Sequence, residues 1–246
     1  SLRNVLYGAA AIAPERLKQA IERFGPVFTQ FFGQTEAPMA LTSLPRELHA
    51  VADPARQAQV LASAGIPTYP TLIRLLDEQG HDVPEGEPGE IVAHAPNVMS
   101  GYLDDPAATA EALREGWLHT GDIARRDAEG YLTIVDRRKD MIVSGGFNVY
   151  PREIEDVLFE HPAVSQAAVI GVPHERWGEE VKALVALRPG HSVTEGELIE
   201  FVKARKGSLT APKSVEFVAA IPVTNLGKVD KKALRARYWN GRTRNV

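Results

Sequence analysis

The N-terminal part of the chain shows a strand pattern, a helix pattern and a second strand pattern in succession, and this order constrains the fold most strongly. The apolar run from Val5 to Tyr7 is typical of a short strand. Pro14 suits the first turn of a helix with apolar residues at helical spacing, and Gly25-Pro26 ends it. The run from Val27 to Phe32 has the pattern of a buried strand. This succession predicts a parallel α/β sheet.

Two loops follow the carboxyl ends of these predicted strands. They are Gly8-Ala9-Ala10 and Gly33-Gln34-Thr35-Glu36. Ligands of open α/β sheets bind at such ends, so Gly8 and Ala9 are candidate ligand contacts together with the second loop.

Residues 68–135 have a different pattern, in which turns separate short apolar runs. Strands are predicted at Leu72–Leu76, Glu90–Ala93 and Tyr131–Val135, and a short helix is predicted from Asp104-Asp105-Pro106 through Leu113. The pattern indicates a small β-rich subdomain.

After Asp136 the pattern changes again. A helix is expected from Pro151, strands at 166–172, 181–187 and 215–218, and a capping box at Thr194 to Glu197. We interpret the chain as an α/β segment with a β-rich subdomain over residues 1–136, followed by a compact α+β domain over 137–246. The boundary is expected between Asp136 and Lys139.

Composition excludes several classes of protein. The chain of 246 residues has a net charge of -4 and no cysteine, so we expect neither nucleic-acid binding nor disulfides nor thiolate metal sites. No apolar run is long enough for a transmembrane segment, and a cytoplasmic location is expected. The basic tail from Arg235 to Arg244 is interpreted as a solvated helix and end. Because the chain starts at Ser1 without a signal pattern, we expect it to be a piece of a longer protein.

Four motifs occur in an order that carries a resemblance. They are Gly33-Gln34-Thr35-Glu36, Trp117-Leu118-His119-Thr120-Gly121-Asp122, the segment Asp136-Arg137-Arg138-Lys139-Asp140 with its following Gly145-Gly146, and Ile221 to Lys228. Together they resemble the later motifs of the adenylate-forming enzymes, the acyl-CoA synthetase and luciferase superfamily. The family's earlier Ser/Thr/Gly-rich phosphate loop does not occur in these 246 residues. The resemblance therefore implies the end of the large AMP-binding N-terminal domain and the whole small, mobile C-terminal domain.

The resemblance implies a ligase that works in two half-reactions. A carboxylate attacks the α-phosphate of ATP, and a thiol, commonly that of coenzyme A, then displaces AMP. In the N-terminal part, Thr35 would bind phosphate, Glu36 would hold Mg²⁺, and Phe32, at a position where the family usually has Tyr, would stack on adenine. Gly33 and Gln34 complete this motif. Asp122 would accept hydrogen bonds from the ribose hydroxyls, and His119 is interpreted as structural.

Further roles are implied for the C-terminal part. Arg137 would contact ribose or phosphate, and Lys139 matches the hinge between the two states of the enzyme. Gly145 and Gly146 would approach the site during thiol transfer. Trp177 would contact pantetheine or pack in the core. Lys228 matches the distal catalytic lysine, which reaches the α-phosphate and the substrate carboxylate.

The expected function is activation of a carboxylic acid, such as a fatty or aryl acid, followed by transfer to coenzyme A. The cofactors and substrates implied are ATP/AMP, Mg²⁺, coenzyme A and a small carboxylic acid. One alternative is an adenylating enzyme that loads a carrier protein, and another is a non-catalytic nucleotide-binding module. Because the phosphate loop is absent, the 246 residues alone are expected to be inactive. The identity of the acid and the oligomeric state stay open.

Overall fold

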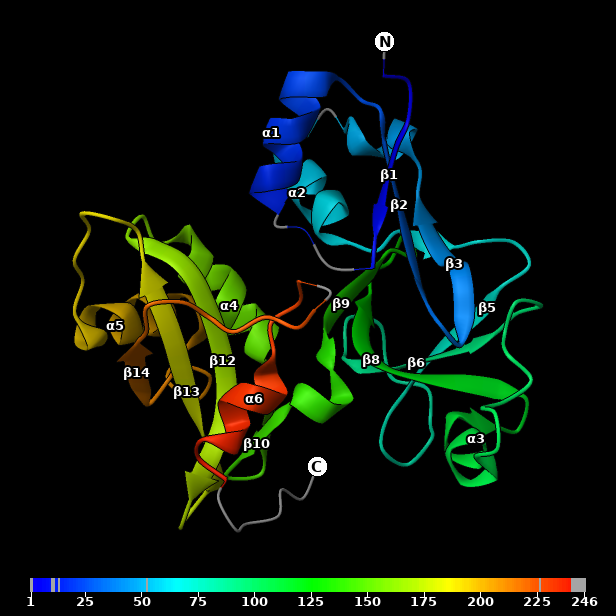
Figure 1. The fold of residues 1–246 in the computed structure, drawn as a ribbon. Helices are drawn as coiled ribbons and strands as arrows, with labels where there is room; N and C mark the ends of the chain where they lie inside the picture. The colour runs from blue at the N-terminus through cyan, green and yellow to red at the C-terminus, as the bar shows by residue number, and fades with distance from the viewer. Residues whose placement is uncertain (1, 10–11, 13, 52, 226, 240–246) are drawn as a thin grey trace. The chain divides into compact units, whose positions relative to one another are not determined.

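The computed structural model describes residues 2–9, 12, 14–51, 53–225 and 227–239 (Figure 1). The chain divides into two compact units, Ser1–Val135 and Asp136–Val246. Within the described residues, no helix has the length and apolar character needed to cross a membrane.

The N-terminal unit begins with a four-stranded sheet in the order β1-β2-β3-β4. Its strands are β1 (Val5–Gly8), β2 (Phe28–Gln34), β3 (Ala37–Leu44) and β4 (Ile66–Pro67). The predicted parallel pairing is confirmed for β1 and β2, but β3 pairs antiparallel with both neighbours, so the sheet is mixed rather than parallel. The helices are α1 (Pro14–Phe24), which matches the prediction, α2 (Pro54–Ala62) and the 3-10 turn η1 (Arg46–His49).

Five further strands of the same unit form a second sheet. They are β5 (Leu72–Leu76), β6 (Gly89–His94), β7 (Leu113–Arg114), β8 (Trp117–Arg126) and β9 (Leu132–Arg137), with α3 (Pro106–Ala112) before β7. The three strands predicted in this region are present. Apolar residues of β3 share one core with β5, β6, β8 and β9, so the two sheets pack against each other.

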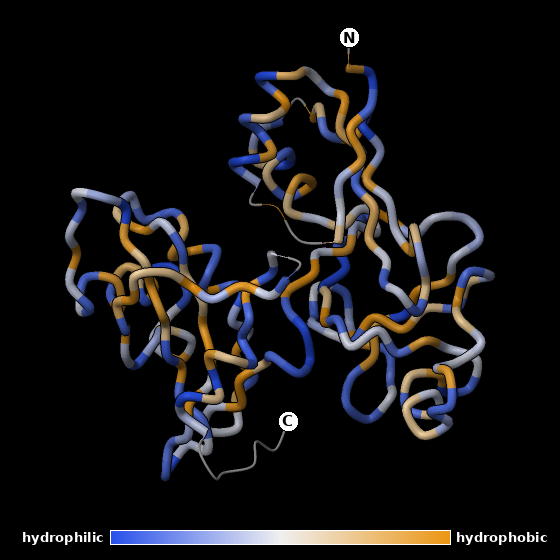
Figure 2. Tube along the Cα trace, viewed as in Figure 1, coloured by the Kyte–Doolittle hydropathy of each residue, from blue (hydrophilic) through white to orange (hydrophobic). Residues whose placement is uncertain are grey.

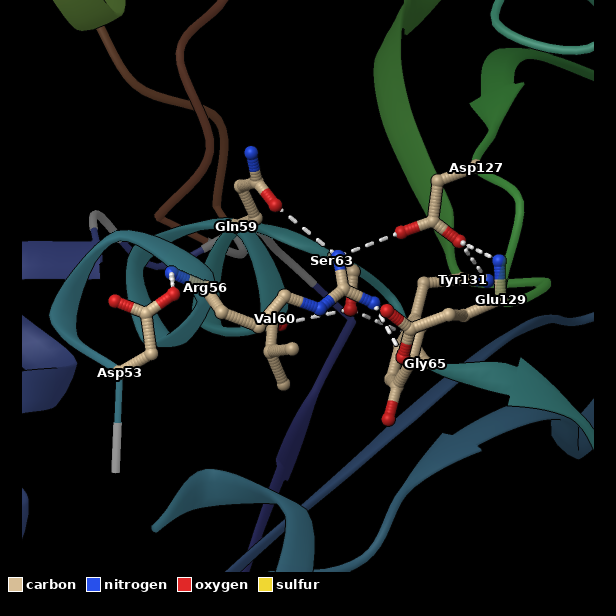
Figure 3. A network of polar contacts seen from close by, with 9 residues as sticks. All are labelled: Asp53, Arg56, Gln59, Val60, Ser63, Gly65, Asp127, Glu129 and Tyr131. Carbon is tan, nitrogen blue, oxygen red and sulfur yellow. Dashed lines mark hydrogen bonds and ion pairs between the residues drawn. The ribbon is translucent and has the colours of Figure 1, made fainter. Parts of the chain in front are cut away.

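Arg56 connects α2 to the second sheet through a polar network (Figure 3). Its guanidinium lies 2.9 Å from Asp127 and 2.9 Å from Glu129, and 4.9 Å from the ring centroid of Tyr131. These three residues lie in the turn between β8 and β9. The network therefore fixes α2 on the turn that follows β8.

The C-terminal unit contains one five-stranded sheet in the order β11-β10-β13-β12, with β14 paired to β13. Its elements are η2 (Arg138–Asp140), β10 (Ile142–Ser144), β11 (Phe147–Val149), α4 (Pro151–Glu160), β12 (Val164–His174), β13 (Gly178–Leu187), α5 (Glu195–Lys206), β14 (Ser214–Phe217) and α6 (Lys231–Ala236). The predicted helix from Pro151, the three strands and the capping box of α5 are confirmed.

Side chains of β12 alternate between the two faces of this sheet. Ala167 and Val169 pack in the core that α4 and α5 complete, whereas Ala168 and Ile170 pack on the other face with Leu234 of α6. Figure 2 shows the apolar stretches of β12 and β13 that supply both cores. A sheet covered on both faces gives the loops at its edges a rigid support.

Candidate active-site residues in two units

Thr35 and Glu36 form the turn of the β2–β3 hairpin. Gln34 pairs with Ala37, and the ladder is irregular between Phe32 and Gln34. A Cβ at Gly33 would lie 2.6 Å from the carbonyl oxygen of Met39, so only glycine fits this irregular position. The motif therefore continues into a strand and does not begin a helix. Phe32, Gly33, Gln34, Thr35 and Glu36 lie together in one hairpin.

The Glu36 carboxylate is held by Tyr102. The Tyr102 hydroxyl donates to Oε1 of Glu36 at 2.6 Å, and this hydrogen bond raises the pKa of Tyr102 to about 12. The backbone N–H of Met99 donates to the Glu36 carbonyl oxygen at 2.7 Å. The side chain and the backbone of Glu36 are thus both tied to residues 99–102, and Tyr102 stays a protonated donor at neutral pH.

Glu36 is the carboxylate at which the sequence predicts a divalent cation. Among the described residues, no group of three or more His, Cys, Asp and Glu side chains comes together as a metal site. This arrangement fits Mg²⁺, which is often bound by one or two carboxylates together with water and substrate phosphates.

Gly8 is the last residue of β1, beside β2, and Ala9 follows it. Gly8 pairs with Phe31, and a Cβ at Gly8 would lie 2.3 Å from the Phe31 carbonyl oxygen. Ala9 adopts a positive φ of 62°, which is uncommon for a residue other than glycine. Ala10, the last residue of the predicted loop, lies outside the described residues. Gly8 therefore permits the close strand contact at the end that carries the loop.

A buried histidine, His49, anchors β1 just before this loop. Tyr7 Oη lies 2.9 Å from Nε2 of His49, and Nδ1 of His49 lies 2.9 Å from the Pro45 carbonyl oxygen. His49 is 0% exposed, and burial lowers its pKa. A neutral His49 can donate to Pro45 and accept from the Tyr7 hydroxyl, which satisfies both ring nitrogens.

Asp122 lies within β8, next to a positive-φ glycine, and is only 5% exposed. Its backbone N–H donates to Thr120 Oγ1 at 3.1 Å, and that hydroxyl donates to the Ile91 carbonyl oxygen at 2.8 Å. Glu90 accepts the N–H of Gly121 at 3.1 Å and lies 3.2 Å from His119 Nδ1. Glu90 and Thr120 thus hold the backbone that presents Asp122, and His119 contacts the same Glu90 carboxylate.

Arg137 is the last residue of β9, and Lys139 lies just after it; both are exposed. Lys139 lies in the 3-10 turn η2. The flanking Asp136 is 7% exposed and accepts the backbone N–H groups of Arg137 and Arg152, at 2.7 and 2.9 Å. Asp140 pairs with Arg235 of α6 at 2.7 Å. Both carboxylates around Lys139 are therefore fixed within the C-terminal unit.

Gly145 and Gly146 form the turn of the β10–β11 hairpin. A Cβ at Gly145 would lie 2.7 Å from Cε3 of Trp177, and the Gly145 N–H donates to the Trp177 carbonyl oxygen at 2.9 Å. At Gly146 a Cβ would meet nothing within 4 Å. Trp177 is 45% exposed, with the Arg176 guanidinium 4.5 Å from its ring centroid. Trp177 is thus a surface platform beside the glycine turn and not a core residue.

Lys228 lies in a small exposed turn that Gly227 closes with a φ of 76°. The Thr224 N–H donates to the Lys228 carbonyl oxygen at 2.7 Å, and Val223 and Val229 form an antiparallel bridge. No ion pair involves the Lys228 ammonium among the residues that the structure describes. Leu226 of the predicted motif lies outside those residues.

Comparison with known proteins places this arrangement in a family. Residues 1–103 match the family model of the AMP-binding enzymes, and residues 153–228 match that of the AMP-binding enzyme C-terminal domain. The chain belongs to the adenylate-forming, AMP-binding enzyme family.

Individual members of this family match nearly the whole chain. A medium/long-chain-fatty-acid–CoA ligase of Mycobacterium tuberculosis is 51% identical over 253 residues, which cover 100% of this chain and 43% of the relative. A feruloyl-CoA synthase of Amycolatopsis is 44% identical, over 97% of this chain and 47% of the relative. The amide bond synthetase McbA of Marinactinospora thermotolerans has a similar structure, with a TM-score of 0.87 and 39% identity over 96% of this chain and 47% of that protein. The chain spans less than half the length of these relatives.

Within this member of the AMP-binding family, sequence reasoning missed two residues that support the expected site. Glu90 could have been noticed as a carboxylate in the otherwise apolar run Ile91-Val92-Ala93. Tyr102 lies outside the four motifs, and no local pattern connects it with Glu36, which lies 66 positions away. Both contacts depend on the pairing of distant segments.

Proposed function

We propose that the full-length protein is an ATP-dependent acid–thiol ligase. In the first half-reaction a carboxylate oxygen of the acid bonds to the α-phosphorus of ATP, and the bond from that phosphorus to the bridging oxygen breaks, which releases pyrophosphate. In the second, the sulfur of coenzyme A bonds to the acyl carbon, the thiol proton passes to solvent, and AMP leaves. The fatty-acid–CoA and feruloyl-CoA ligases among the relatives support this reaction.

The observation that carries the proposal is the Lys228 turn. The Lys228 side chain is exposed, so it has no role in core packing. The matched C-terminal family model ends at this residue. An ammonium on a flexible four-carbon stem is suited to reach an anionic phosphorus centre and stabilise its charge. We assign Lys228 to the adenylation step.

Residues of the N-terminal unit are proposed to hold the nucleotide and the metal. Asp122 would accept hydrogen bonds from vicinal ribose hydroxyls, and its burial would strengthen such bonds relative to water. Thr35 would donate to a phosphate oxygen, and Phe32 would stack on adenine. Glu36, oriented by Tyr102, would hold Mg²⁺, which when bound withdraws charge from the phosphate oxygens.

We assign the remaining candidates to ligand contacts and to the change between the two half-reactions. Gly8, Ala9, Gly33 and Gln34 would contact the nucleotide through their backbone. Arg137 would contact ribose or phosphate, and Lys139 would be the hinge. Gly145, Gly146 and Trp177 would border the pantetheine path, which is supported by the exposed indole beside the glycine turn.

Acid-dependent exchange of labelled pyrophosphate into ATP tests this function. The full-length protein should catalyse exchange with ATP, Mg²⁺ and at least one acid from a panel of medium-chain, long-chain and aryl acids, and should form a thioester when coenzyme A is added. A folded protein that shows no exchange with any acid would contradict the proposal.

Two of the similar proteins support an alternative in which the acyl group is transferred to an acceptor other than coenzyme A. One relative, of Streptomyces coeruleorubidus, is a fatty acid–[acyl-carrier-protein] ligase with 37% identity, and McbA is an amide bond synthetase. Exchange without thioester formation, followed by transfer to a carrier protein or an amine, would retain the adenylation step and replace coenzyme A as the acceptor.

A further inference from the structure

The Lys228 turn buries little surface of its own. Residues 222–225 and 227–229 are exposed, including Val223 at 56% and Val229 at 40%. The Asp230 N–H donates to the Pro222 carbonyl oxygen at 2.9 Å and closes the loop at its base. Since packing within the turn is sparse, the direction of the Lys228 side chain depends on what holds this base.

Lys231, the first residue of α6, anchors the base on the side that follows Lys228. Its ammonium lies 2.9 Å from Oε1 of Glu155 on α4, and the two side chains are only 12% and 15% exposed. The same carboxylate oxygen accepts the backbone N–H of Val169 on β12 at 2.7 Å. One ion pair therefore connects the base of the turn to a helix and to the edge strand β12 of the sheet.

The charge of Lys231 also acts on Asp136. Burial raises the pKa of Asp136, and the positive charge of Lys231 opposes this effect. Burial works to lower the pKa of Lys231, but the carboxylates of Glu155, Asp136 and Asp140 outweigh it and raise that pKa. A charged Lys231 therefore compensates two buried carboxylates, and one of them begins the segment that joins the two units.

Arg235 lies one helical turn after Lys231 on the same face of α6. Its ion pair with Asp140 measures 2.7 Å, and each side chain is 15% exposed. The face of α6 that carries these two cations thus interacts with both ends of the segment Asp136–Asp140. Lys139, the proposed hinge, lies between those ends.

We propose that Lys231 is a positioning residue for Lys228. By binding Glu155 and compensating Asp136, it fixes the base of the Lys228 turn to the segment that joins the units, so that the Lys228 ammonium keeps a defined position relative to that segment. Removing the cation would leave two buried carboxylates uncompensated and release the base of the turn. The inference rests on the proposed function, in which Lys228 acts in adenylation.

A double-mutant cycle in the full-length protein tests this role. Pyrophosphate exchange is measured for wild type, Lys231→Met, Lys228→Ala and the double variant, with Lys232→Met as the control. Lys232 is the exposed neighbour of Lys231 on the same helix. Lys231→Met should lower kcat about tenfold or more with little change in the KM for ATP, because a displaced catalytic group loses rate rather than ground-state binding. Lys232→Met should behave as wild type.

The double variant separates positioning from general damage to the fold. If Lys231 acts through Lys228, Lys231→Met should cause less than about a twofold further loss once Lys228 is alanine. The same proportional loss in both backgrounds, or wild-type exchange in Lys231→Met, would overturn the inference. If Lys231→Met does not fold, Glu155→Gln replaces it in the cycle, since it keeps an acceptor for Val169 while removing the charge partner. An absent or additive effect of Glu155→Gln would then overturn it.

The controls also distinguish this inference from the proposed function. If the wild type catalyses exchange and Lys228→Ala loses most of it, the proposed function is supported regardless of the result for Lys231→Met. An unaffected Lys231→Met would then reject only the positioning role. No exchange by the wild type would overturn both. Normal exchange by Lys228→Ala would reject the role of Lys228 in adenylation, and with it the positioning role of Lys231, while the proposed ligase function would stand.

Discussion

At the scale of single residues, the proposed chemistry depends on side chains that short backbone turns present. Lys228 follows a glycine with a positive φ, and Glu36 lies in a hairpin turn after a strand in which Gly33 has no room for a Cβ. Such turns place a polar group at the surface while the adjoining strands stay rigid. A single substitution in such a turn should therefore affect the chemistry more than the stability, because the turn itself buries little surface.

Lys228→Ala should affect the two half-reactions differently. In the full-length protein we expect pyrophosphate exchange to fall about a hundredfold or more, the scale seen when one preorganised transition-state contact is lost. Conversion of pre-made acyl-adenylate to acyl-CoA should stay largely intact, and so should the fold, because the side chain is exposed. Separate assays of each half-reaction and a thermal melt measure these outcomes. An unchanged exchange rate would remove Lys228 from the mechanism.

Gly145 and Gly146 provide a matched pair of substitutions. Gly145→Ala combines a positive φ of 59° with a contact of 2.7 Å to Trp177, whereas Gly146→Ala has a φ of 84° and open space. We expect Gly145→Ala to lose about 1–3 kcal/mol of stability and to change Trp177 fluorescence. Gly146→Ala should lose about 1 kcal/mol from backbone strain alone. Urea unfolding compares them, and equal losses would show that the indole moves away without cost.

At the scale of secondary-structure elements, the sequence predicted those with strong local patterns. The bounds of α1 and β5 agree with the predictions, and the capping box of α5 forms both of its hydrogen bonds. The long strand β8 was not predicted, because His119, Thr120 and Gly121 interrupt its apolar pattern. Its backbone is held by the buried Glu90 on the neighbouring strand, a contact that only sheet pairing creates.

The pairing of β3 shows the same limit. The strand–helix–strand pattern correctly predicted that β1 and β2 are parallel, but β3 returns along β2 after a tight turn at Thr35 and Glu36. The motif at residues 33–36, which we predicted to be a ligand loop, also forms a hairpin turn. No residue pattern in it predicted the antiparallel strand that makes the sheet mixed. Likewise, Tyr102 and Lys231 were not predicted as site-supporting residues, because their partners are distant in sequence.

The β1–η1 contact predicts a pH dependence of stability. Burial lowers the pKa of His49 in the folded state. In the unfolded chain the histidine is protonated near its ordinary pKa of about 6.5. The contribution of His49 is therefore intact above that pH and decreases as the pH falls below it. We expect the urea midpoint of the wild type to fall more between about pH 7.5 and 5.5 than that of His49→Gln.

His81 gives a control for this experiment. Its side chain is 78% exposed, so His81→Gln should keep the wild-type pH dependence. If His49→Gln and the wild type lost stability in parallel over this range, the neutral, buried state of His49 would not be the cause.

At the scale of the whole molecule, the proposed site residues are divided between two compact units. Glu36 and Asp122 belong to the N-terminal unit, and Lys139, Gly145 and Lys228 belong to the C-terminal unit. In the proposed two-step reaction, residues of the second unit would serve different steps, and we place the origin of that change in the segment Asp136–Asp140.

Lys139→Pro tests the hinge in the full-length protein. Proline fixes one backbone angle and restricts the preceding residue, so it should impede a rotation at this position. We expect acyl-adenylate formation to be retained better than thioester formation, by about tenfold or more. Arg138→Ala, which leaves the backbone unrestricted, serves as the comparison. Equal losses of both half-reactions in Lys139→Pro would place the hinge elsewhere.

Acid-dependent pyrophosphate exchange, measured in parallel on the full-length protein and on the 246-residue chain, tests the central claim most directly. We expect clear exchange by the full-length protein and background exchange by the chain, because these residues include the proposed ribose, metal and lysine contacts but no Gly-rich phosphate loop. Both proteins should first be shown to be folded. Absence of acid-dependent exchange in the folded full-length protein would contradict the account that this chain belongs to an enzyme that activates carboxylic acids.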